Sequence, residues 1–349
     1  MQEILRPDSA PAANTPFPRE RTPLLDWEKS VKEPKQGAVI ACIDRSSMDL
    51  PVVAHARELA HRLGADLVFA QVLEPSVALE GPQDPLSWGI RRHKCRERFN
   101  WLAEQHGFER VPKQVLLEGR PAKQLADWAG SGASSILTLA THCEDWGAGT
   151  GLGSTAQKLL DRASASLLLV PPGASTSPEF DRIVVPLDGS CRADSVLPTV
   201  IAMAKVNGGE VIAVHVVPEP HLTEIGPLEP EAIRLRDEII RRNEQVARTY
   251  IERVLRRLRA AGVDARAIIN HGDPRERLQQ VIIDQNADLL VTASHGQSGR
   301  SDVACGSVVY DLATHATRPM LILRQDEAAA LRGMTGDAAS RSAPLQAHQ

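Results

Sequence analysis

The stretch from Ala293 to Ser307 combines glycines, hydroxyl side chains and a histidine in a pattern suited to holding a phosphate. Its glycines and serines are Gly296, Gly299, Gly306, Ser294, Ser298, Ser301 and Ser307. An apolar run at 288–292 precedes it and predicts a buried parallel strand, and the run at 308–315 predicts a helix. A turn of this kind brings backbone N–H groups and the positive end of a helix to one point. The stretch alone also fits an ordinary strand-to-helix turn with a serine at the helix cap.

The same landmarks occur in two copies along the chain. Ala140-Thr141-His142-Cys143 also follows an apolar run, and nine residues separate Cys143 from Gly153, as nine separate Gly296 from Gly306. Further matches are Asp44 with Asp188, Val72 with Val216, Gly119-Arg120-Pro121 with Gly272-Asp273-Pro274, and Gly153-Ser154 with Gly306-Ser307. Equal spacings at separated landmarks indicate an internal duplication. Two copies of this length predict a pair of domains and not a solenoid.

The composition limits the classes of function. With 349 residues the chain is long enough for two domains, and its 42% hydrophobic content without a membrane-length apolar run predicts a soluble protein that does not enter a membrane. A net charge of −4 and an aromatic content of 3% argue against nucleic acid as a partner. The five cysteines are scattered, and the first residues lack the pattern of a secretory signal, so we expect a cytoplasmic location.

The alternation of strand and helix patterns predicts the domain organisation. We expect a proline-rich N-terminal arm at 1–36, repeat 1 at 37–172, a linker at 173–179, repeat 2 at 180–324 and a C-terminal tail at 325–349. The expected strands are 38–43, 66–73, 113–117, 135–140 and 166–170 in repeat 1, and 182–187, 210–217, 265–269, 288–293 and 319–324 in repeat 2. Such alternation is typical of an α/β fold, in which a parallel sheet has helices on both faces.

The longest expected helix, at 231–261, is rich in arginine. Its apolar residues are expected to form a stripe facing the core, made of Ile239, Ile240, Ala247, Ile251, Val254, Leu255 and Leu258. Acidic residues such as Glu244 and Glu252 share the outer face with the arginines. We therefore interpret the arginines as a solvated face with salt bridges, and not as a nucleic-acid site.

Each repeat places an aspartate, Asp44 or Asp188, at the end of its first strand, and its glycine loop at the end of its fourth strand. In an open parallel sheet, ligands bind beyond the carboxyl ends of the strands, where the strand order reverses. There an aspartate can accept a hydrogen bond from the exocyclic amine of adenine while the loop holds the phosphates. Taken alone, Asp188-Gly189-Ser190 also fits an Asx-turn or a helix cap.

Each repeat resembles a universal stress protein domain. The nucleotide loop of that family has a small residue or glycine, two residues, a glycine, nine residues, and then Gly-Ser or Gly-Thr. Repeat 2 follows it with Ala293, Gly296, Gly306 and Ser307. The resemblance implies two tandem flavodoxin-like (adenine nucleotide alpha hydrolase-like) domains, each with a five-stranded parallel sheet of order 3-2-1-4-5 flanked by helices. It also implies that the repeats pair through their last strands, at 166–170 and 320–323, as a pseudo-dimer within one chain.

The resemblance further implies an adenine nucleotide, ATP above all, accompanied by Mg²⁺. In repeat 2 the implied binding residues are Pro186, Leu187, Asp188, Val216, Ala293, His295, Gly296, Gly306, Ser307 and Val308. The weaker set in repeat 1 is Asp44, Val72, Ala140, His142, Gly153 and Ser154.

Repeat 1 departs from the family pattern at two positions. Cys143 stands where the second glycine belongs, and Arg45 replaces the glycine after the aspartate. Where the backbone needs a positive φ, a side chain costs roughly 1 kcal/mol and crowds the phosphates. Glycines within 147–153 offer the loop another path. We expect the site in repeat 1 to be weaker than that in repeat 2, or empty.

Competing motifs match poorly. Gly151-x-Gly153-x-x-Ala156 has the spacing of a dinucleotide-binding turn, but it begins about ten residues after its strand and not directly behind it. There is neither a G-x-x-x-x-G-K-[ST] loop nor a G-x-S-x-G elbow, so we predict no catalytic residues and at most slow ATP hydrolysis. His142 with Cys143, and His295 with Cys305, lack the spacing of metal ligands, so no metal site is expected.

Three hypotheses stay open at this point. The leading one is a tandem universal stress protein that binds ATP chiefly in repeat 2 and acts in the stress response as a nucleotide-dependent regulatory or interaction protein, alone or as a homodimer. The second is an interaction module that works without nucleotide. The third is an enzyme built on a related nucleotide-binding sheet.

Overall fold

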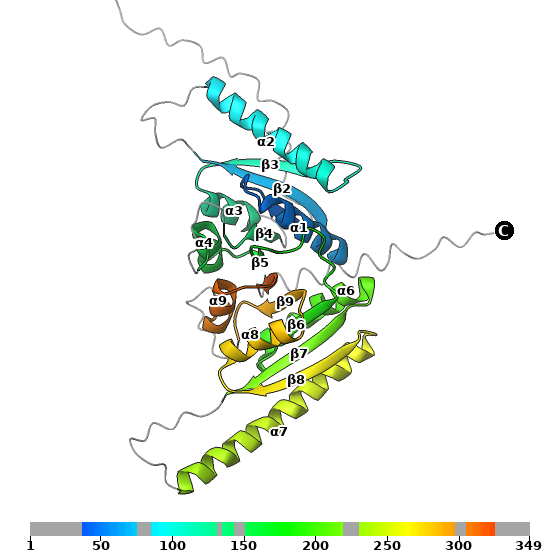
Figure 1. Cartoon of the computed structure of the whole chain (residues 1–349), viewed down its shortest axis with the longest axis vertical. Coiled ribbons are helices and arrows are strands. Elements are labelled where there is room, and N and C mark those ends of the chain that lie inside the picture. Colours follow the sequence, from blue (N-terminus) through cyan, green and yellow to red (C-terminus); the bar gives the residue numbers. More distant parts are fainter. Residues whose placement is uncertain are drawn as a thin grey trace, which may run out of the picture. The chain divides into compact units, whose positions relative to one another are not determined.

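The computed structural model describes residues 37–74, 85–130, 135–142, 151–218, 230–296 and 305–324 (Figure 1). The predicted arm, the predicted tail and the middle of both glycine loops, with Cys143, lie outside the described residues. Repeat 1 contains β1 (Ala38–Cys42), α1 (Asp49–Leu63), β2 (Asp66–Leu73), α2 (Pro85–Gln105), β3 (Lys113–Glu118), α3 (Pro121–Gly130), β4 (Ile136–Ala140), α4 (Ser154–Arg162) and β5 (Ser166–Val170). Repeat 2 contains β6 (Arg182–Pro186), α5 (Cys191–Asp194), α6 (Leu197–Asn207), β7 (Glu210–Val217), α7 (Pro230–Ala260), β8 (Ala265–His271), α8 (Pro274–Asp284), β9 (Leu289–Ala293), α9 (Ser307–Thr314) and β10 (Met320–Leu323).

The strands of the described residues form one sheet in the order β3-β2-β1-β4-β5-β10-β9-β6-β7-β8. Pairings within each repeat are parallel, and the order 3-2-1-4-5 is confirmed in both repeats. β10 pairs with β5 in antiparallel fashion, with Leu321 opposite Leu168, so the repeats join through their last strands. Because this pairing is antiparallel, the carboxyl ends of the strands lie at opposite edges of the sheet in the two repeats.

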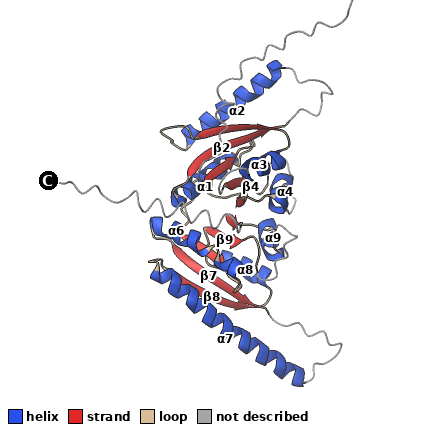
Figure 2. Ribbon diagram, turned by 180° about the vertical axis from the view of Figure 1, so that it is seen from behind, coloured by secondary structure: helices blue, strands red, loops and turns tan. Residues whose placement is uncertain are grey.

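Two apolar layers cover the two faces of the sheet, because successive residues of a strand point to opposite sides. In β1, Val39 and Ala41 face the layer that includes α1, α2, α6 and α7. Ala38 and Ile40 face the layer that includes α3, α4, α8 and α9. Figure 2 shows these helices on the two sides of the strands. Both layers contain residues of both repeats, so the core continues across the β5–β10 seam.

A buried arginine of repeat 1 binds several groups of repeat 2. Arg62 Nη1 donates to the carbonyl oxygen of Met203 at 3.3 Å, and Nη2 donates to the carbonyl oxygen of Glu179 and, at 3.3 Å, to the carboxylate of Asp181. Its Nε donates to Glu58 at 2.6 Å within α1. The Arg62 side chain is 0% exposed, and a buried cation needs partners of this kind because its desolvation is costly. Arg62 therefore fastens α1 to the start of repeat 2.

Helix α7 matches the predicted arginine-rich helix, but the predicted core stripe holds only in its C-terminal half. Ala247 and Ile251 are buried, whereas Ile239 is 39% exposed, so the prediction was wrong for Ile239. The reason is that the N-terminal half of α7 runs past the edge strand β8 (Figure 1). On the outer face Arg248 pairs with Glu244 at 2.6 Å, as expected for a solvated helix face.

Candidate functional site

In repeat 2, Asp188 fixes the turn that follows β6. Its Oδ1 accepts a hydrogen bond from the backbone N–H of Ser190 at 2.9 Å. The hydroxyl of Ser190 accepts in turn from the N–H of Ala193 at 3.0 Å and caps α5. Gly189 between them has a φ of 87°, a conformation that favours glycine. Asp188 thus forms the Asx-turn that the sequence allowed, with Leu187 buried and Pro186 half-buried just before it.

The end of β9 lies directly beside this turn. A Cβ built on Gly296 would collide with Oδ2 of Asp188, so any other residue at position 296 would displace this carboxylate. His295 Nδ1 lies 3.1 Å from the hydroxyl of Ser294, and Ala293 is buried at the end of the strand. The structure therefore brings Asp188, Ala293, His295 and Gly296 together at the carboxyl edge of the sheet.

The start of α9 is held against the same edge. Gly306, with φ −70° and ψ 152°, is the N-cap residue, and its N–H donates to the carbonyl oxygen of Ser294 at 2.8 Å. The hydroxyl of Ser307 is not the cap, since Ser307 is the first helical residue. Because a glycine cap has no side chain, the N–H groups of Ser307, Val308 and Val309 have no partner among the described residues.

Two other helices of repeat 2, α5 and α8, have a side-chain cap, whereas α6 has none. Asp273 caps α8, where its Oδ1 accepts from the N–H of Arg275 at 2.7 Å. Ser190 caps α5, as described above. The start of α9 thus offers a set of backbone donors at the positive end of a helix, which is the arrangement that binds an anion.

The end of β7 contributes His215 and Val216. His215 Nδ1 lies 2.7 Å from the carbonyl oxygen of Leu187, and its ring packs edge-on against Tyr250 of α7. The Tyr250 hydroxyl donates to Asp194 at 2.5 Å, and burial together with Asp194 raises the pKa of Tyr250 above its ordinary value. Val216 is half-buried and packs with the α8–α9 layer. These contacts hold the β6–α5 turn from the side of β7.

Repeat 1 has the same turn after its first strand and the same glycine N-cap as repeat 2. Asp44 Oδ1 accepts from the N–H of Ser46 at 2.9 Å, which is the same Asx-turn. Gly153, with φ −58° and ψ 149°, is the N-cap residue of α4, and its N–H donates to the carbonyl oxygen of Thr141 at 2.7 Å. The N–H groups of residues 154–156 have no partner within the described part of the chain. The structure thus places Asp44, Gly153 and Ser154 as it places their counterparts in repeat 2.

The remaining predicted residues of repeat 1 lie at the same edge. Val72 and Ala140 are half-buried at the ends of β2 and β4. His142 Nδ1 lies 3.0 Å from the hydroxyl of Thr141, and its Nε2 is buried without a hydrogen-bond partner among the described residues. A buried polar atom in this state points to a partner that the described protein atoms do not supply.

A buried ion pair that the sequence analysis missed distinguishes repeat 1. Asp49 Oδ1 accepts from the backbone N–H groups of Asp44 and Arg45 at 3.1 and 3.3 Å, and its Oδ2 accepts from Arg98 Nε at 2.8 Å. Burial raises the pKa of Asp49 from an ordinary 3.8 to about 6, although the hydrogen bond from Arg98 lowers it. A second acid follows the motif aspartate closely in both repeats, and this was the available signal.

Two cysteines near the sites, Cys42 and Cys305, have raised thiol pKa values. Burial, together with the charge of Asp44, raises the pKa of Cys42 to about 12. Burial likewise raises the pKa of Cys305 to about 11. A thiol with such a pKa is protonated at neutral pH and lacks the thiolate that metals and oxidants require. Among the described residues there is also no group of three or more His, Cys, Asp or Glu residues that could hold a metal ion.

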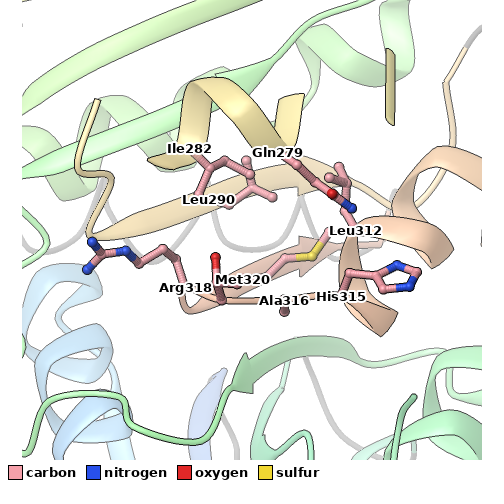
Figure 3. A pocket seen from close by; sticks show the side chains of 9 residues that line it. Gln279, Ile282, Leu290, Leu312, His315, Ala316, Arg318 and Met320 are labelled. Carbon is pink, nitrogen blue, oxygen red and sulfur yellow. The ribbon is translucent and has the colours of Figure 1, made fainter. Parts of the chain in front are cut away.

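A small cavity of about 20 Å³ lies elsewhere in repeat 2 (Figure 3). Its lining includes Leu290 and Met320, which lie at the amino ends of β9 and β10, together with Gln279, His315 and Arg318. It therefore lies at the edge of the sheet opposite Asp188 and has room for about one water molecule. The helices in the described ranges are too short or too polar to cross a membrane.

The sequence model of the universal stress protein family matches residues 37–171 and again residues 179–324. The chain belongs to this family. The universal stress protein MJ0577 of Methanocaldococcus jannaschii is 23% identical over 155 residues, which are 42% of this chain and 96% of that protein. It thus matches a single repeat of this tandem universal stress protein.

A solved structure of the family shows the same fold. A universal stress protein from Archaeoglobus fulgidus DSM 4304 is similar with a TM-score of 0.56 and 17% identity, over 82% of this chain and 98% of that one. A universal stress protein solved in complex with cAMP is 20% identical, with a TM-score of 0.31, over 42% of this chain and 98% of that one.

Proposed function

We propose that this universal stress protein binds ATP or another adenine nucleotide, chiefly in repeat 2. One observation carries the proposal. The uncapped start of α9, with the N–H groups of Ser307, Val308 and Val309, is tied by Gly306 to the end of β9. Gly296 and Asp188 lie at the same strand end. Donors that are fixed before the ligand arrives bind phosphate oxygens without a further cost of ordering.

The glycine at position 306 supports a role in binding, because the fold itself does not require it. Its φ of −70° and ψ of 152° are open to any residue. A Cβ at this position would lie 3.6 Å from the nearest atom, the carbonyl oxygen of Ser294, which is an ordinary contact. The missing side chain leaves room above the helix start, where a phosphate would lie.

The adenine would lie between Asp188 and Val216, at the ends of β6 and β7, where a carboxylate can accept from its exocyclic amine. The Asp188 carboxylate also lies close to Gly296 and would repel phosphates bound there. Mg²⁺ accompanying the nucleotide would offset this repulsion. The complex of a family member with cAMP is in keeping with an adenine nucleotide.

The proposed role is that of a nucleotide-dependent regulatory or interaction protein of the stress response in the cytoplasm. No acid or base is assigned to the phosphate site, so any hydrolysis of ATP would be slow. The β5–β10 pairing already joins two family domains in one chain, and a homodimer would add further domains to this pair.

The test is ATP binding by the Gly306→Val variant, measured by isothermal titration calorimetry. We expect binding to fall by at least about a hundredfold, since the valine side chain fills the phosphate position. The matched control is Gly153→Val, whose Cβ would lie 3.1 Å from the carbonyl oxygen of Thr141. The control should lose more stability than Gly306→Val and yet keep the tight site. Unchanged ATP binding by Gly306→Val would refute the proposal.

A further inference from the structure

A hollow of about 360 Å³ lies in repeat 1 between the turn after β1 and the C-terminal half of α2. Its lining residues are Arg45, Lys94, Glu97, Arg98 and Trp101. They include none of the residues assigned to the nucleotide sites. The hollow has the volume of a small-molecule site and is lined by three cations and one carboxylate. Its charge is therefore positive.

One wall of the hollow is held in place by hydrogen bonds of Arg98. Arg98 donates through Nε to Asp49 at 2.8 Å and through Nη2 to the carbonyl oxygen of Ser46 at 3.0 Å. Its guanidinium lies 4.4 Å from the centroid of the Trp101 ring. Asp49 is buried, and Trp101 is 37% exposed. The pair of Arg98 and Trp101 thus presents a fixed guanidinium, whose charge Asp49 partly balances, next to a partly exposed indole ring.

The other cations lack carboxylate partners. Arg45 and Lys94 are exposed, and neither forms an ion pair with an acid within the described ranges. The remaining lining acid, Glu97, faces His93, and its Oε1 lies 3.4 Å from His93 Nε2. Arg45 and Lys94 beside the fixed Arg98 suit a doubly charged anion, because the lining carries more cations than carboxylates.

The backbone at Arg45 is strained in a way that the fold does not need. Arg45 has a φ of 73°, and its counterpart in repeat 2 is Gly189 with a φ of 87°. A residue with a Cβ is unfavourable in this conformation, and glycine is tolerated without strain. Strained residues of this kind are concentrated at functional sites. At this position the strain is accompanied by a cationic side chain in the wall of the hollow.

Repeat 2 lacks this positive charge. The buried Cys95 of α2 corresponds to the buried Ala247 of α7, and this register aligns the two helices. The corresponding pairs are Lys94 and Val246, Arg98 and Tyr250, Trp101 and Arg253, and Arg45 and Gly189. Both helices stack an arginine on an aromatic ring, in exchanged order, which supports the register. The positions that line the hollow therefore carry three cations in repeat 1, and their counterparts in repeat 2 carry one.

We propose that this hollow binds a small phosphate monoester that carries an apolar ring. The dianionic phosphate would lie between Arg45, Lys94 and Arg98, and the ring would lie against the exposed part of Trp101. Phosphate is favoured over a carboxylate because its three oxygens can be shared by three cations at once. The site is independent of the adenine nucleotide proposed for repeat 2.

The test is calorimetric titration of the full chain with phenyl phosphate. Arg45→Gly and Lys94→Gln should each weaken binding by about tenfold or more. Arg45→Gly should at the same time raise the melting temperature, so its loss of affinity cannot come from unfolding. Arg256→Gln, an exposed arginine on α7, is the matched control and should bind as the parent does.

Four results would overturn the proposal. The first is that the parent does not bind phenyl phosphate up to millimolar concentrations, and the second is that Arg45→Gly and Lys94→Gln both keep the affinity of the parent. The third is that Arg256→Gln loses as much affinity as these two variants. The fourth is that the parent binds glutarate, a dicarboxylate of the same charge, as tightly as phenyl phosphate. ATP binding in repeat 2 should be unaffected by Arg45→Gly and Lys94→Gln, which separates this test from that of the nucleotide site.

Discussion

After β6 the chain turns through Gly189, and at the same point after β1 it turns through Arg45, with a positive φ in both cases. Asp188 and Asp44 close the two turns with the same 2.9 Å hydrogen bond to a serine N–H. The backbone of the turn is therefore set by the aspartate and the strand ends, and not by the residue at the turn. Repeat 1 has kept the shape of the edge while its side chains have changed.

The backbones of the two turns are alike, but the side chains that contact the turns differ. In repeat 1 a buried carboxylate, Asp49, accepts from the backbone of the turn and is paired with Arg98. In repeat 2 a nearby acid, Asp194, accepts from the hydroxyl of Tyr250 and also pairs with Arg253 at 3.7 Å. The pair of Asp49 and Arg98 in repeat 1 is shorter and more buried than the pair of Asp194 and Arg253 in repeat 2. The comparison indicates that duplicated sites of one fold can diverge in electrostatics while the main chain stays the same.

The largest expected effect concerns a second contrast between the repeats. Arg62 lies two residues before Gly64, the glycine that ends α1, and its side chain is buried. In repeat 2, Val206 lies two residues before Gly208, the glycine that ends α6, and it is 43% exposed. Arg62→Leu should lower the free energy of unfolding by about 3–5 kcal/mol, because the buried carbonyl oxygen of Met203 and the partly buried carbonyl oxygen of Glu179 lose their donor. Val206→Leu should change it by less than about 0.5 kcal/mol. Urea unfolding measures both, and similar values for the two variants would contradict the role of Arg62.

The next effect is the pH dependence that Asp49 gives to repeat 1. The folded-state pKa of Asp49 is raised to about 6, above its ordinary 3.8, so the folded state binds this proton more tightly than the unfolded state. The stability contributed is fully present below about pH 4 and is lost as the pH rises through 6. Relative to Asp49→Asn, the parent should gain up to about 3 kcal/mol of unfolding free energy between pH 7 and pH 4. Parallel pH curves for the parent and Asp49→Asn would show that Asp49 titrates normally.

The smallest effect is a reciprocal exchange at the turn itself. Arg45→Gly should raise the free energy of unfolding by about 1 kcal/mol, and Gly189→Arg should lower it by about the same amount, because glycine adopts a positive φ without the strain that a Cβ brings. Thermal unfolding of both variants tests the pair. Effects of the same sign would mean that the two turns are not equivalent.

Local patterns were enough to predict where the strands lie, and the family resemblance implied their order in each repeat. The ten apolar runs lie within two residues of the observed strands, because each buried strand carries its own apolar signal. The placement of Asp188 beside Gly296 also followed from the sequence, since carboxyl ends of parallel strands meet at one edge.

Features that depend on distant packing were not predictable in this way. Arg62 resembles a solvent-exposed residue of a last helical turn, and it is buried only because repeat 2 covers it. Ile239 belongs to an apolar stripe, yet it is 39% exposed because α7 runs beyond the end of β8 (Figure 1). The ion pair of Asp49 and Arg98 joins residues 49 positions apart, and neither residue alone signals the other.

The most direct test of the account is the number of ATP molecules bound per chain, measured by calorimetric titration of the full-length protein. We predict one tight site, abolished by Gly306→Val and retained in Gly153→Val, with any second site much weaker. Two equally tight sites, or a tight site lost in Gly153→Val and kept in Gly306→Val, would contradict the assignment of nucleotide binding to repeat 2.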